Sequence, residues 1–365
     1  MVEFWRLGAY PAPLTELGSI AARLEALGWD GLAFGEGQAG SPDQYVCLAL
    51  AANATTTLKV GSGVSVPTRH PQITASAMAT VNAVARGRAV FSLGRGDGAM
   101  HQLGQQPMKV REFETYVSRL QAYLRRETVD LEGFESTISS LFERDSSIDL
   151  PKTRVDISAT GPKVIDIAAR LGDGVTFSVG ADVGRLRGLV EQARAARERA
   201  GLEDRPFGLG CYLPVAVGRG DDLTRAREYI RGAVMTQARF GALHGKPSSA
   251  VAAEDAQVIQ RAVEAVGQAY RTHGKRSTGG GTFYPKDLLD DAFVDRFAVV
   301  GSPEQCAEKL QSIIDLGFDR LVLLTKSLGQ DPQEENATRF AQEVIPLLRD
   351  GSPSSPNRTQ QHLLN

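Results

Sequence analysis

Residues 28–37 read Gly-Trp-Asp-Gly-Leu-Ala-Phe-Gly-Glu-Gly and contain a helix end, a strand and a glycine-rich turn. Gly28 ends a helix whose apolar residues recur every three or four positions from Leu17 to Leu27. The short apolar run after it predicts a buried strand, and Gly35-Glu36-Gly37 predicts the turn that follows. A helix that leads directly into a buried strand is typical of the repeating unit of α/β proteins.

The same alternation recurs along the chain in both directions from this stretch. It predicts eight strands, most of them followed by a helix, which is the number in a (β/α)8 TIM barrel. An open, doubly wound sheet is the second candidate, but the even spacing and an eighth strand near the C-terminus favour a closed barrel. The polar residues 132–150 predict a long loop. The predicted strands are residues 2–8, 30–34, 58–64, 88–93, 154–158, 174–179, 207–217 and 320–324.

The interval between the seventh and eighth predicted strands is too long for one connection. It contains helical patterns at 223–240, 253–270 and around 288–297, and a glycine run at 278–282 that predicts a mobile loop. We interpret about 219–300 as a helical insertion over the C-terminal mouth of the barrel. The domain prediction is one barrel domain over 1–349 and a disordered tail over 350–365.

Composition excludes several classes of protein. The 365 residues contain 41 Lys+Arg and 43 Asp+Glu, a formal charge of −2, which argues against a dedicated nucleic-acid binder. No run approaches the ~18–20 apolar residues of a membrane span, and no secretory signal is expected. The three cysteines are far apart and form no CxxC pair, and no HExxH motif or His/Cys cluster exists. We therefore expect a cytoplasmic protein without a metal site.

Active sites of barrels lie at the C-terminal ends of the strands, so candidate residues are sought there. After the fifth strand, Thr160-Gly161 precedes a helix that starts at Pro162, the favoured first helical residue. Free backbone N–H groups, the positive end of the helix dipole and Lys163 favour an anion, most simply a phosphate. A plain helix start has the same composition, so the residues alone leave the two interpretations evenly balanced.

Two acids and a glycine-rich turn follow neighbouring strands. Gly94-Arg95-Gly96-Asp97-Gly98 lacks the glycine at the sixth position of the dinucleotide fingerprint G-x-G-x-x-G. It therefore predicts only a tight turn where the backbone can approach a ligand. Glu36 and Asp97 are carboxylates at adjacent strand ends, where they can serve proton transfer or remain solvated acids. Arg69 and Arg95 can meet an acidic ligand or balance these acids.

Together these motifs resemble the bacterial-luciferase-like flavin and deazaflavin superfamily. The similarity is greatest to the branch that contains methylenetetrahydromethanopterin reductase, whose members use the deazaflavin hydride carrier coenzyme F420. It extends over almost the whole chain, to about Leu348. The segments that carry it are 61–71 (GSGVSVPTRHP), 87–97 (GRAVFSLGRGD), 159–163 (ATGPK), 172–175 (GDGV) and 297–307 (FAVVGSPEQCA).

The resemblance implies roles for individual residues. Gly63-Val64 matches a non-prolyl cis peptide that supports the tricyclic ring, and Arg95-Gly96 matches a turn that binds the ring and tail. Thr160-Gly161, with Pro162 and Lys163, falls on the cofactor phosphate site. Asp97 falls where a glucose-6-phosphate dehydrogenase of the family has a catalytic glutamate, but its side chain is shorter.

The second strand departs from the family pattern. It is followed by Glu36-Gly37, whereas relatives often have Asp-His. Glu36 is still expected to contact the ring, but a histidine cannot assist there, so glucose 6-phosphate is a poor substrate prediction.

The resulting functional prediction is an F420-dependent oxidoreductase that transfers a hydride between deazaflavin C5 and a small organic substrate. Asp97 or Glu36 would handle the proton. The alternatives are an FMN-dependent luciferase-like monooxygenase, a non-catalytic flavin- or deazaflavin-binding protein and, if no flavin binds, a metal-free lyase or glycosidase that uses Glu36 and Asp97. Analogy with the family predicts a homodimer.

Overall fold

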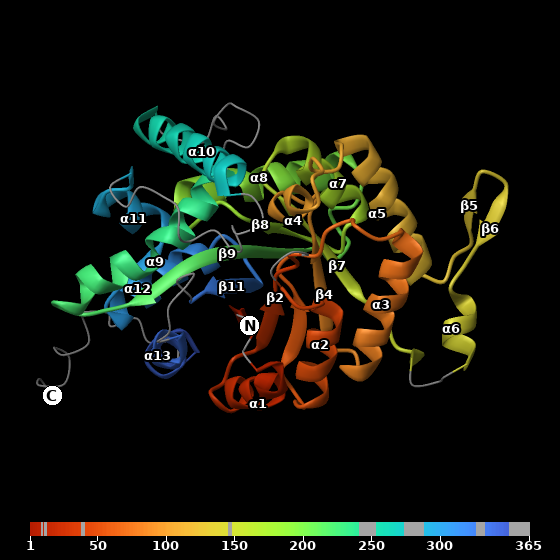
Figure 1. Cartoon of the computed structure of the whole chain (residues 1–365), viewed down its shortest axis with the longest axis horizontal. Coiled ribbons are helices and arrows are strands. Elements are labelled where there is room, and N and C mark those ends of the chain that lie inside the picture. The colour runs from red at the N-terminus through yellow and green to blue at the C-terminus, as the bar shows by residue number, and fades with distance from the viewer. Residues whose placement is uncertain are drawn as a thin grey trace, which may run out of the picture.

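The computed structural model describes residues 1–8, 10, 13–37, 41–144, 148–240, 253–273, 288–325 and 333–349. Its centre is a closed barrel of eight parallel strands, surrounded by helices (Figure 1). Each strand pairs with the next, and β11 closes the ring against β1. The (β/α)8 prediction is confirmed, and the open doubly wound sheet is wrong. The barrel strands are β1 (Glu3–Leu7), β2 (Gly31–Phe34), β3 (Lys59–Ser62), β4 (Ala89–Leu93), β7 (Arg154–Ala159), β8 (Gly174–Phe177), β9 (Gly208–Val217) and β11 (Arg320–Leu324).

Helices cover the outside of the barrel because each presents an apolar stripe to it. In α5 (Val110–Leu124), for example, Phe113, Val117 and Leu120 are fully buried. None of the described helices is both long and apolar enough to cross a membrane. The other helices around the barrel are α1 (Leu17–Ala26), α2 (Gln44–Asn53), α3 (Pro71–Val84), α4 (Gly98–Gln102), α7 (Pro162–Leu171), α8 (Val183–Arg199), α12 (Pro303–Ile314), α13 (Gln333–Arg339) and α14 (Ile345–Arg349), with a π-helical segment, Phe340–Val344, between the last two.

The long loop predicted for residues 132–150 is wrong. β5 (Val129–Leu131) and β6 (Phe134–Ser136) form an antiparallel hairpin that projects from the barrel and leads into α6 (Ser139–Arg144) (Figure 1). Asp130 accepts a hydrogen bond from the N–H of Gly133 at 2.7 Å, and the two turn residues, Glu132 and Gly133, have positive φ. A two-residue turn with positive φ suits the twist of a hairpin.

Helices α9 (Asp222–Arg239), α10 (Ala253–His273) and α11 (Asp291–Phe297) lie between β9 and β10 (Val299–Gly301). α10 and α11 pack against α9, and their buried side chains form an apolar cluster separate from that of the barrel. β10, which the sequence did not predict, pairs with the end of β9. The single domain over 1–349 and the insertion over 219–300 stay predictions, and the glycine run 278–282 and the tail 350–365 lie outside the described residues.

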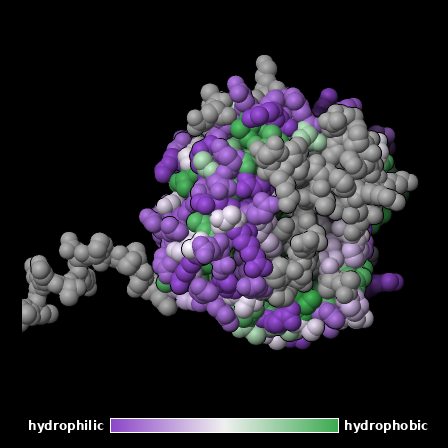
Figure 2. Space-filling view, turned by 60° about the vertical axis from the view of Figure 1, so that its left-hand side comes forward, coloured by the Kyte–Doolittle hydropathy of each residue, from purple (hydrophilic) through white to green (hydrophobic). Residues whose placement is uncertain are grey.

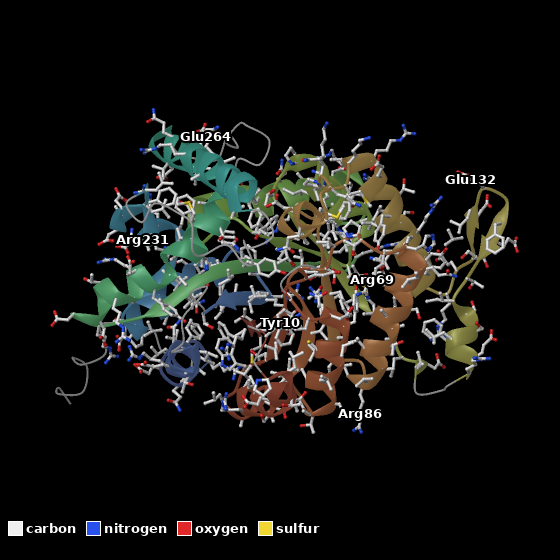
Figure 3. The ribbon with its side chains drawn as sticks, viewed as in Figure 1. Tyr10, Arg69, Arg86, Glu132, Arg231 and Glu264 are labelled. Atoms are coloured by element: carbon white, nitrogen blue, oxygen red, sulfur yellow. The ribbon has the colours of Figure 1, made fainter. Side chains whose placement is uncertain are left out.

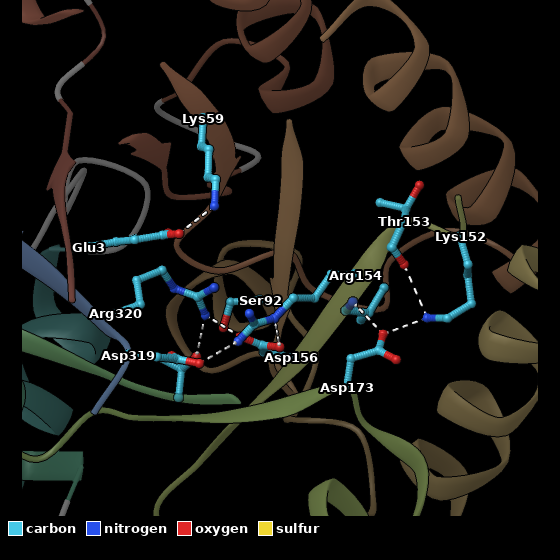
Figure 4. A network of polar contacts seen from close by, with 12 residues as sticks. Glu3, Lys59, Ser92, Lys152, Thr153, Arg154, Asp156, Asp173, Asp319 and Arg320 are labelled. Atoms are coloured by element: carbon cyan, nitrogen blue, oxygen red, sulfur yellow. Dashed lines mark hydrogen bonds and ion pairs between the residues drawn. The ribbon is translucent and has the colours of Figure 1, made fainter. Parts of the chain in front are cut away.

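Charged side chains fill part of the barrel interior. Arg320 forms an ion pair with Asp156, and both side chains are buried (Figure 4). Arg154 donates to the other carboxylate oxygen of Asp156 at 2.9 Å, and Arg320 donates to Thr176 at 3.2 Å. Burial opposes ionisation of Asp156, but the two guanidinium groups outweigh it and lower the pKa of Asp156. Arg154 and Asp156 lie on β7 and Arg320 lies on β11, at or near the N-terminal ends of these strands. Residues at that end of a barrel contribute to stability, whereas the active site lies at the opposite end.

Candidate functional site

Glu36 is fixed at the C-terminal end of β2 by the chain that follows β3. Its N–H donates to the carbonyl of Val64 at 3.1 Å, and its carboxylate accepts hydrogen bonds from the N–H of Val66 at 2.8 Å and the hydroxyl of Thr68 at 3.4 Å. The residue is partly buried, and burial raises the pKa of its carboxyl although these donors oppose the shift. Glu36 is therefore a positioned acid at the mouth of the barrel.

Gly63 and Val64, which follow β3, leave the regular strand pairing before Ser65 pairs with Leu93, and we call this two-residue segment the bulge. The peptide bond Gly63–Val64 is cis, as the resemblance predicts. The N–H of Gly63 still donates to Phe34 on β2 at 2.7 Å, and the N–H of Ser65 donates to Ser92 on β4 at 2.8 Å. The peptide between these two anchors is therefore held at the mouth from both sides.

The barrel interior supports this peptide from one side. A Cβ on Gly63 would lie 2.6 Å from Leu7 Cδ1 and 3.2 Å from Tyr212 Cε1, so only glycine fits there without a shift. The Tyr212 hydroxyl donates to the carbonyl of Ser62 at 3.4 Å. On the neighbouring strand, a Cβ on Gly94 would lie 3.2 Å from the Val64 side chain. The bulge therefore rests on packed side chains.

The turn after β4 is fixed by its own side chains. Arg95 Nε donates to the carbonyl of Met108 at 2.6 Å, and the N–H of Met108 donates back to the carbonyl of Arg95 at 3.1 Å. Gly96 has a φ of +80°, and a Cβ there would lie 2.3 Å from the Met100 side chain. Asp97, partly buried, is the residue before α4. Arg95-Gly96 thus forms an ordered turn, and its ligand-binding role stays a prediction.

The start of α7 has the open backbone that an anion site needs. Gly161 is the N-cap residue and brings no side chain to the first-turn N–H groups. Among the described residues, a Cβ on Gly161 would have no heavy atom within 4 Å. Pro162 is the first helical residue and Lys163 is exposed. Open space and a cation therefore coincide at this helix start, beside Thr160. The N–H groups of Val164 and Ile165 both donate to the carbonyl of Gly161 at 3.1 Å, and Pro162 has no N–H.

The structure brings the predicted site residues to one side of the mouth, because they follow four successive strands. β2, β3, β4 and β7 are hydrogen-bonded neighbours in that order. Glu36 follows the first, Gly63-Val64 the second, Arg95 to Asp97 the third and Thr160 to Lys163 the fourth. The predicted phosphate site and the bulge are thus separated by one strand only.

Two side chains near the ends of β2 and β3, Gln44 and Asp43, were not singled out by the sequence analysis. Gln44 donates to the carbonyl of Phe34 and accepts from the Ser65 hydroxyl at 2.7 Å, so it joins the ends of β2 and β3. Asp43 caps α2 and forms an ion pair with Arg69. The N-cap pattern Ser-Pro-Asp at 41–43 was the available signal for Asp43, whereas nothing in the sequence marks Gln44.

The helices between β9 and β10 also reach the mouth. The hydroxyl of Ser178, just after β8, donates to Gln237 of α9 at 2.8 Å, and Tyr229 donates to the carbonyl of Thr325, just after β11, at 2.9 Å. Figure 3 shows that Tyr10 and Arg69 lie by the barrel, whereas Arg231 and Glu264 lie on the outlying helices.

Among the described residues, no group of three or more His, Cys, Asp or Glu side chains could hold a metal ion.

Comparison with known proteins identifies the family of this chain. The family model described as luciferase-like monooxygenase matches residues 2–320. A 5,10-methylenetetrahydromethanopterin reductase of Archaeoglobus fulgidus is 26% identical over 84% of this chain and 87% of its own. An F420-dependent glucose-6-phosphate dehydrogenase of Beutenbergia cavernae is 25% identical over 85% of this chain and 84% of its own.

Solved structures confirm the fold. The coenzyme F420-dependent tetrahydromethanopterin reductase of Methanopyrus kandleri superposes with a TM-score of 0.70 at 19% identity, over 95% of this chain and 99% of that one. An F420-dependent secondary alcohol dehydrogenase superposes with a TM-score of 0.66 at 14% identity, over 96% and 99% of the two chains. With a family model that spans most of its length and a barrel of the same kind, this chain belongs to the luciferase-like monooxygenase family.

Proposed function

We propose that this protein is a coenzyme F420-dependent oxidoreductase that transfers a hydride between the deazaflavin and a small organic substrate. The observation that carries the proposal is the row of glycines at the mouth: Gly35, Gly63 and Gly94 follow three adjacent parallel strands. A Cβ at Gly63 would lie 2.6 Å from Leu7 and one at Gly94 would lie 3.2 Å from Val64, so these glycines let the strand ends pack closely, and the partly buried acid Glu36 follows Gly35. Relatives named as F420-dependent enzymes, matched over most of the chain, support the choice of cofactor.

The residues present fit such a cofactor. A phosphate needs space and positive charge, which Gly161 and the exposed Lys163 supply at the start of α7, and the cis peptide Gly63–Val64, which the resemblance assigns to the ring, lies at the mouth. When bound, coenzyme F420 supplies the carbon that gives or accepts the hydride. The residues that would hold it are Glu36, Gly63, Val64, Arg95, Gly96, Thr160, Gly161, Pro162 and Lys163.

Within this proposal, the protein supplies orientation and proton handling. Burial raises the pKa of Glu36, and the hydrogen bond from the Val66 N–H opposes this rise while it fixes the position of the carboxyl group. Asp97, on the next strand but one, is the second candidate for the proton. The helices α9 to α11 would shape the substrate pocket, because α9 contacts the ends of β8 and β11. Glucose 6-phosphate remains a poor substrate prediction because Gly37 follows Glu36.

The second candidate is an FMN-dependent monooxygenase. The name of the family and the similarity of the fold to an EDTA monooxygenase, with a TM-score of 0.63, support this second candidate. A non-catalytic binding protein is the third.

The testing experiment is a fluorescence and absorbance titration of the purified protein with F420 and with FMN, side by side. Selective binding of F420, followed by substrate turnover that is independent of oxygen, is the expected result. Selective binding of FMN with oxygen consumption would replace the proposal by the monooxygenase, and binding without turnover of any tested substrate would favour the third candidate.

We also infer a homodimer in the cytoplasm. Val46 on α2 and Ile73 on α3 are more than half exposed, and these two helices pack against each other, so exposed apolar side chains lie on adjacent helices. By contrast, hydrophilic side chains dominate the described surface on the side of α11 to α13 (Figure 2). The three cysteines are buried and free, which fits a reducing compartment. Light scattering after gel filtration tests the dimer, which Ile73→Asp should dissociate.

A further inference from the structure

Ser178 faces the interior of the barrel at its mouth. Side chains alternate between the two faces of a strand. In β8, Thr176 points into the barrel, where it accepts a hydrogen bond from Arg320 at 3.2 Å. Val175 and Phe177, on the other face, belong to the apolar core that the barrel shares with the surrounding helices. Ser178, two residues after Thr176, therefore lies on the interior side, just past the C-terminal end of β8.

Gln237 of α9 is held against this serine. Its Oε1 accepts a hydrogen bond from the Ser178 hydroxyl at 2.8 Å, and only 4% of the residue is exposed. Its Nε2 makes no hydrogen bond within the described part of the chain, and it is not one of the wholly buried unpaired atoms there. One end of the amide is therefore fixed, and the other end has two N–H donors to offer at the mouth.

The backbone that follows Ser178 is fixed from two sides. Arg185 of α8 donates to the carbonyl of Val179 at 3.3 Å, and the N–H of Ala181 donates to the carbonyl of Phe297, at the end of α11, at 2.8 Å. The serine that orients Gln237 is thus part of an ordered segment. An amide held in this way loses little conformational freedom when it binds a ligand.

The pair of Ser178 and Gln237 lies on a part of the mouth that the predicted cofactor residues leave open. Those residues follow β2, β3, β4 and β7, and β8 is the next strand of the ring. An apolar cluster in the barrel interior includes Val64 of the bulge and Leu324 of β11, and Leu324 also packs against the cluster of α9 to α11. The bulge and α9 therefore border the same part of the barrel interior.

We propose that Gln237, oriented by Ser178, is a substrate-binding residue that donates a hydrogen bond to the carbonyl oxygen of a neutral ketone. An amide N–H group needs an oxygen acceptor, and neither member of the pair carries a charge. A carbonyl oxygen suits them better than a carboxylate or phosphate, which arginine and lysine bind more strongly. The proposal rests on the proposed function where it makes the ketone a substrate, whereas the hydrogen bond itself needs no hydride transfer.

The first arm of the test observes the Gln237 amide directly. The full chain, labelled with ¹⁵N in its glutamine side chains, is titrated by NMR with acetone, cyclohexanone and acetophenone, with and without F420. The Gln237 signal is assigned by its absence in Gln237→Leu. At least one ketone should move the Gln237 amide protons downfield in a saturable manner and show a nuclear Overhauser effect to them. A Gln237 signal that none of the three ketones moves overturns the proposal.

Gln237→Glu is the isosteric test variant. Glutamate retains the shape and an oxygen acceptor for the Ser178 hydroxyl, but it has no N–H donor for the ketone. The dissociation constant of the ketone should rise by about three- to tenfold, the effect of one lost hydrogen bond. Ser178→Ala, which frees the amide, should have a smaller effect in the same direction.

Gln260→Leu is the matched control for Gln237→Leu. Gln260 lies on α10 and donates to Glu264 at the surface at 3.1 Å, so the control removes the same group from a neighbouring helix. It should leave ketone affinity unchanged, whereas Gln237→Leu should weaken binding at least as much as Gln237→Glu. Equal affinity in the Gln237 variants and the control overturns the proposal.

The second arm measures reduction of the bound ketone by reduced F420. Gln237→Glu should raise KM by the same factor as the dissociation constant, with a smaller change in kcat. A loss confined to kcat overturns the binding role, and F420 binding without turnover of any of the ketones overturns the substrate assignment. Failure of F420 to bind at all would contradict the proposed function, and the NMR arm would still decide whether Gln237 binds ketones.

Discussion

The carboxylate of Glu36 accepts a hydrogen bond from the backbone N–H of Val66 over 2.8 Å, which ties the end of β2 to the chain after the bulge. An acid held in this way has a fixed position relative to the backbone of β3, whatever its protonation state. Replacement by glutamine retains an oxygen acceptor for Val66 but removes the titratable carboxyl group, so it separates structure from chemistry at one position.

Glu36→Gln is accordingly expected to reduce kcat by about 100-fold or more, the usual contribution of a positioned acid or base, with little change in the dissociation constant of F420. Asp97→Asn is the parallel variant. Steady-state kinetics and fluorescence titration of both proteins identify the proton carrier. A larger loss in Asp97→Asn than in Glu36→Gln would transfer the role to Asp97.

Gly161→Ala should weaken F420 binding without loss of stability. The structure has open space at the Cβ position of Gly161, and its φ of −122° suits alanine, so the fold tolerates the change. The methyl group would, however, occupy space that a phosphate needs at the start of α7. We expect roughly a tenfold higher dissociation constant, about 1.4 kcal/mol.

Gly188→Ala is the control for this variant, because Gly188 lies inside α8 and also has open space around its Cβ position. It should raise the melting temperature slightly, since alanine favours a helix over glycine by about 1 kcal/mol. Equal F420 affinity in both variants would contradict a phosphate site at Gly161.

Gly63→Ala tests the support under the bulge. The new methyl group would meet Leu7 Cδ1 at 2.6 Å, so we expect a loss of about 1–3 kcal/mol in stability and weaker F420 binding. The second replacement Leu7→Ala should restore part of the binding by making room. A double variant no better than Gly63→Ala alone would show that Leu7 does not limit this position. Melting curves and titrations supply both readouts.

Asp156→Asn should destabilise the barrel by about 3–5 kcal/mol, because it leaves Arg320 and Arg154 without their shared carboxylate. Since the folded protein lowers the pKa of Asp156, this stabilisation is present above the usual aspartate pKa of about 3.9. It is lost as the pH falls through the lower value of the folded state.

Urea denaturation at several pH values measures this effect. The wild-type protein should lose stability more steeply than Asp156→Asn as the pH falls below about 4. Parallel curves for the two proteins would mean that the ion pair contributes nothing to acid sensitivity.

Strands and helices that are determined by short-range sequence patterns could be predicted from the sequence. The strand at 320–324 is an apolar run, and the helix at 162–171 starts at a proline, so both were located correctly. The strand predicted over 58–64 ends earlier, at Ser62, because the next two residues leave the ladder to form the bulge. The hairpin at 129–136 was missed because each of its strands has only three residues and its Glu132-Gly133 turn is not one of the strong hairpin pairs.

Contacts made across the barrel could not be predicted. Arg320 and Asp156 are 164 positions apart, and their pairing exists only because the barrel closes. Likewise, the ion pair between Asp43 and Arg69 joins segments that are distant until β2 and β3 lie side by side. The ends of four strands were predicted as the site from the fold, but the ion pair between Asp43 and Arg69 near them required the coordinates.

The separate apolar cluster of α9, α10 and α11 has an evolutionary consequence. Phe293 and Phe297 stack on each other within it at 4.3 Å, and the barrel side chains that hold the mouth belong to other clusters. Changes in the residues of these helices can therefore accumulate with little disturbance to β2, β3 and β4, because the barrel residue in this cluster, Ala216, lies on β9. If these helices shape the substrate pocket as proposed, they can diversify the compounds accepted while the strand ends stay constant, so chimaeras that exchange α9 to α11 between relatives offer a practical route to new specificities.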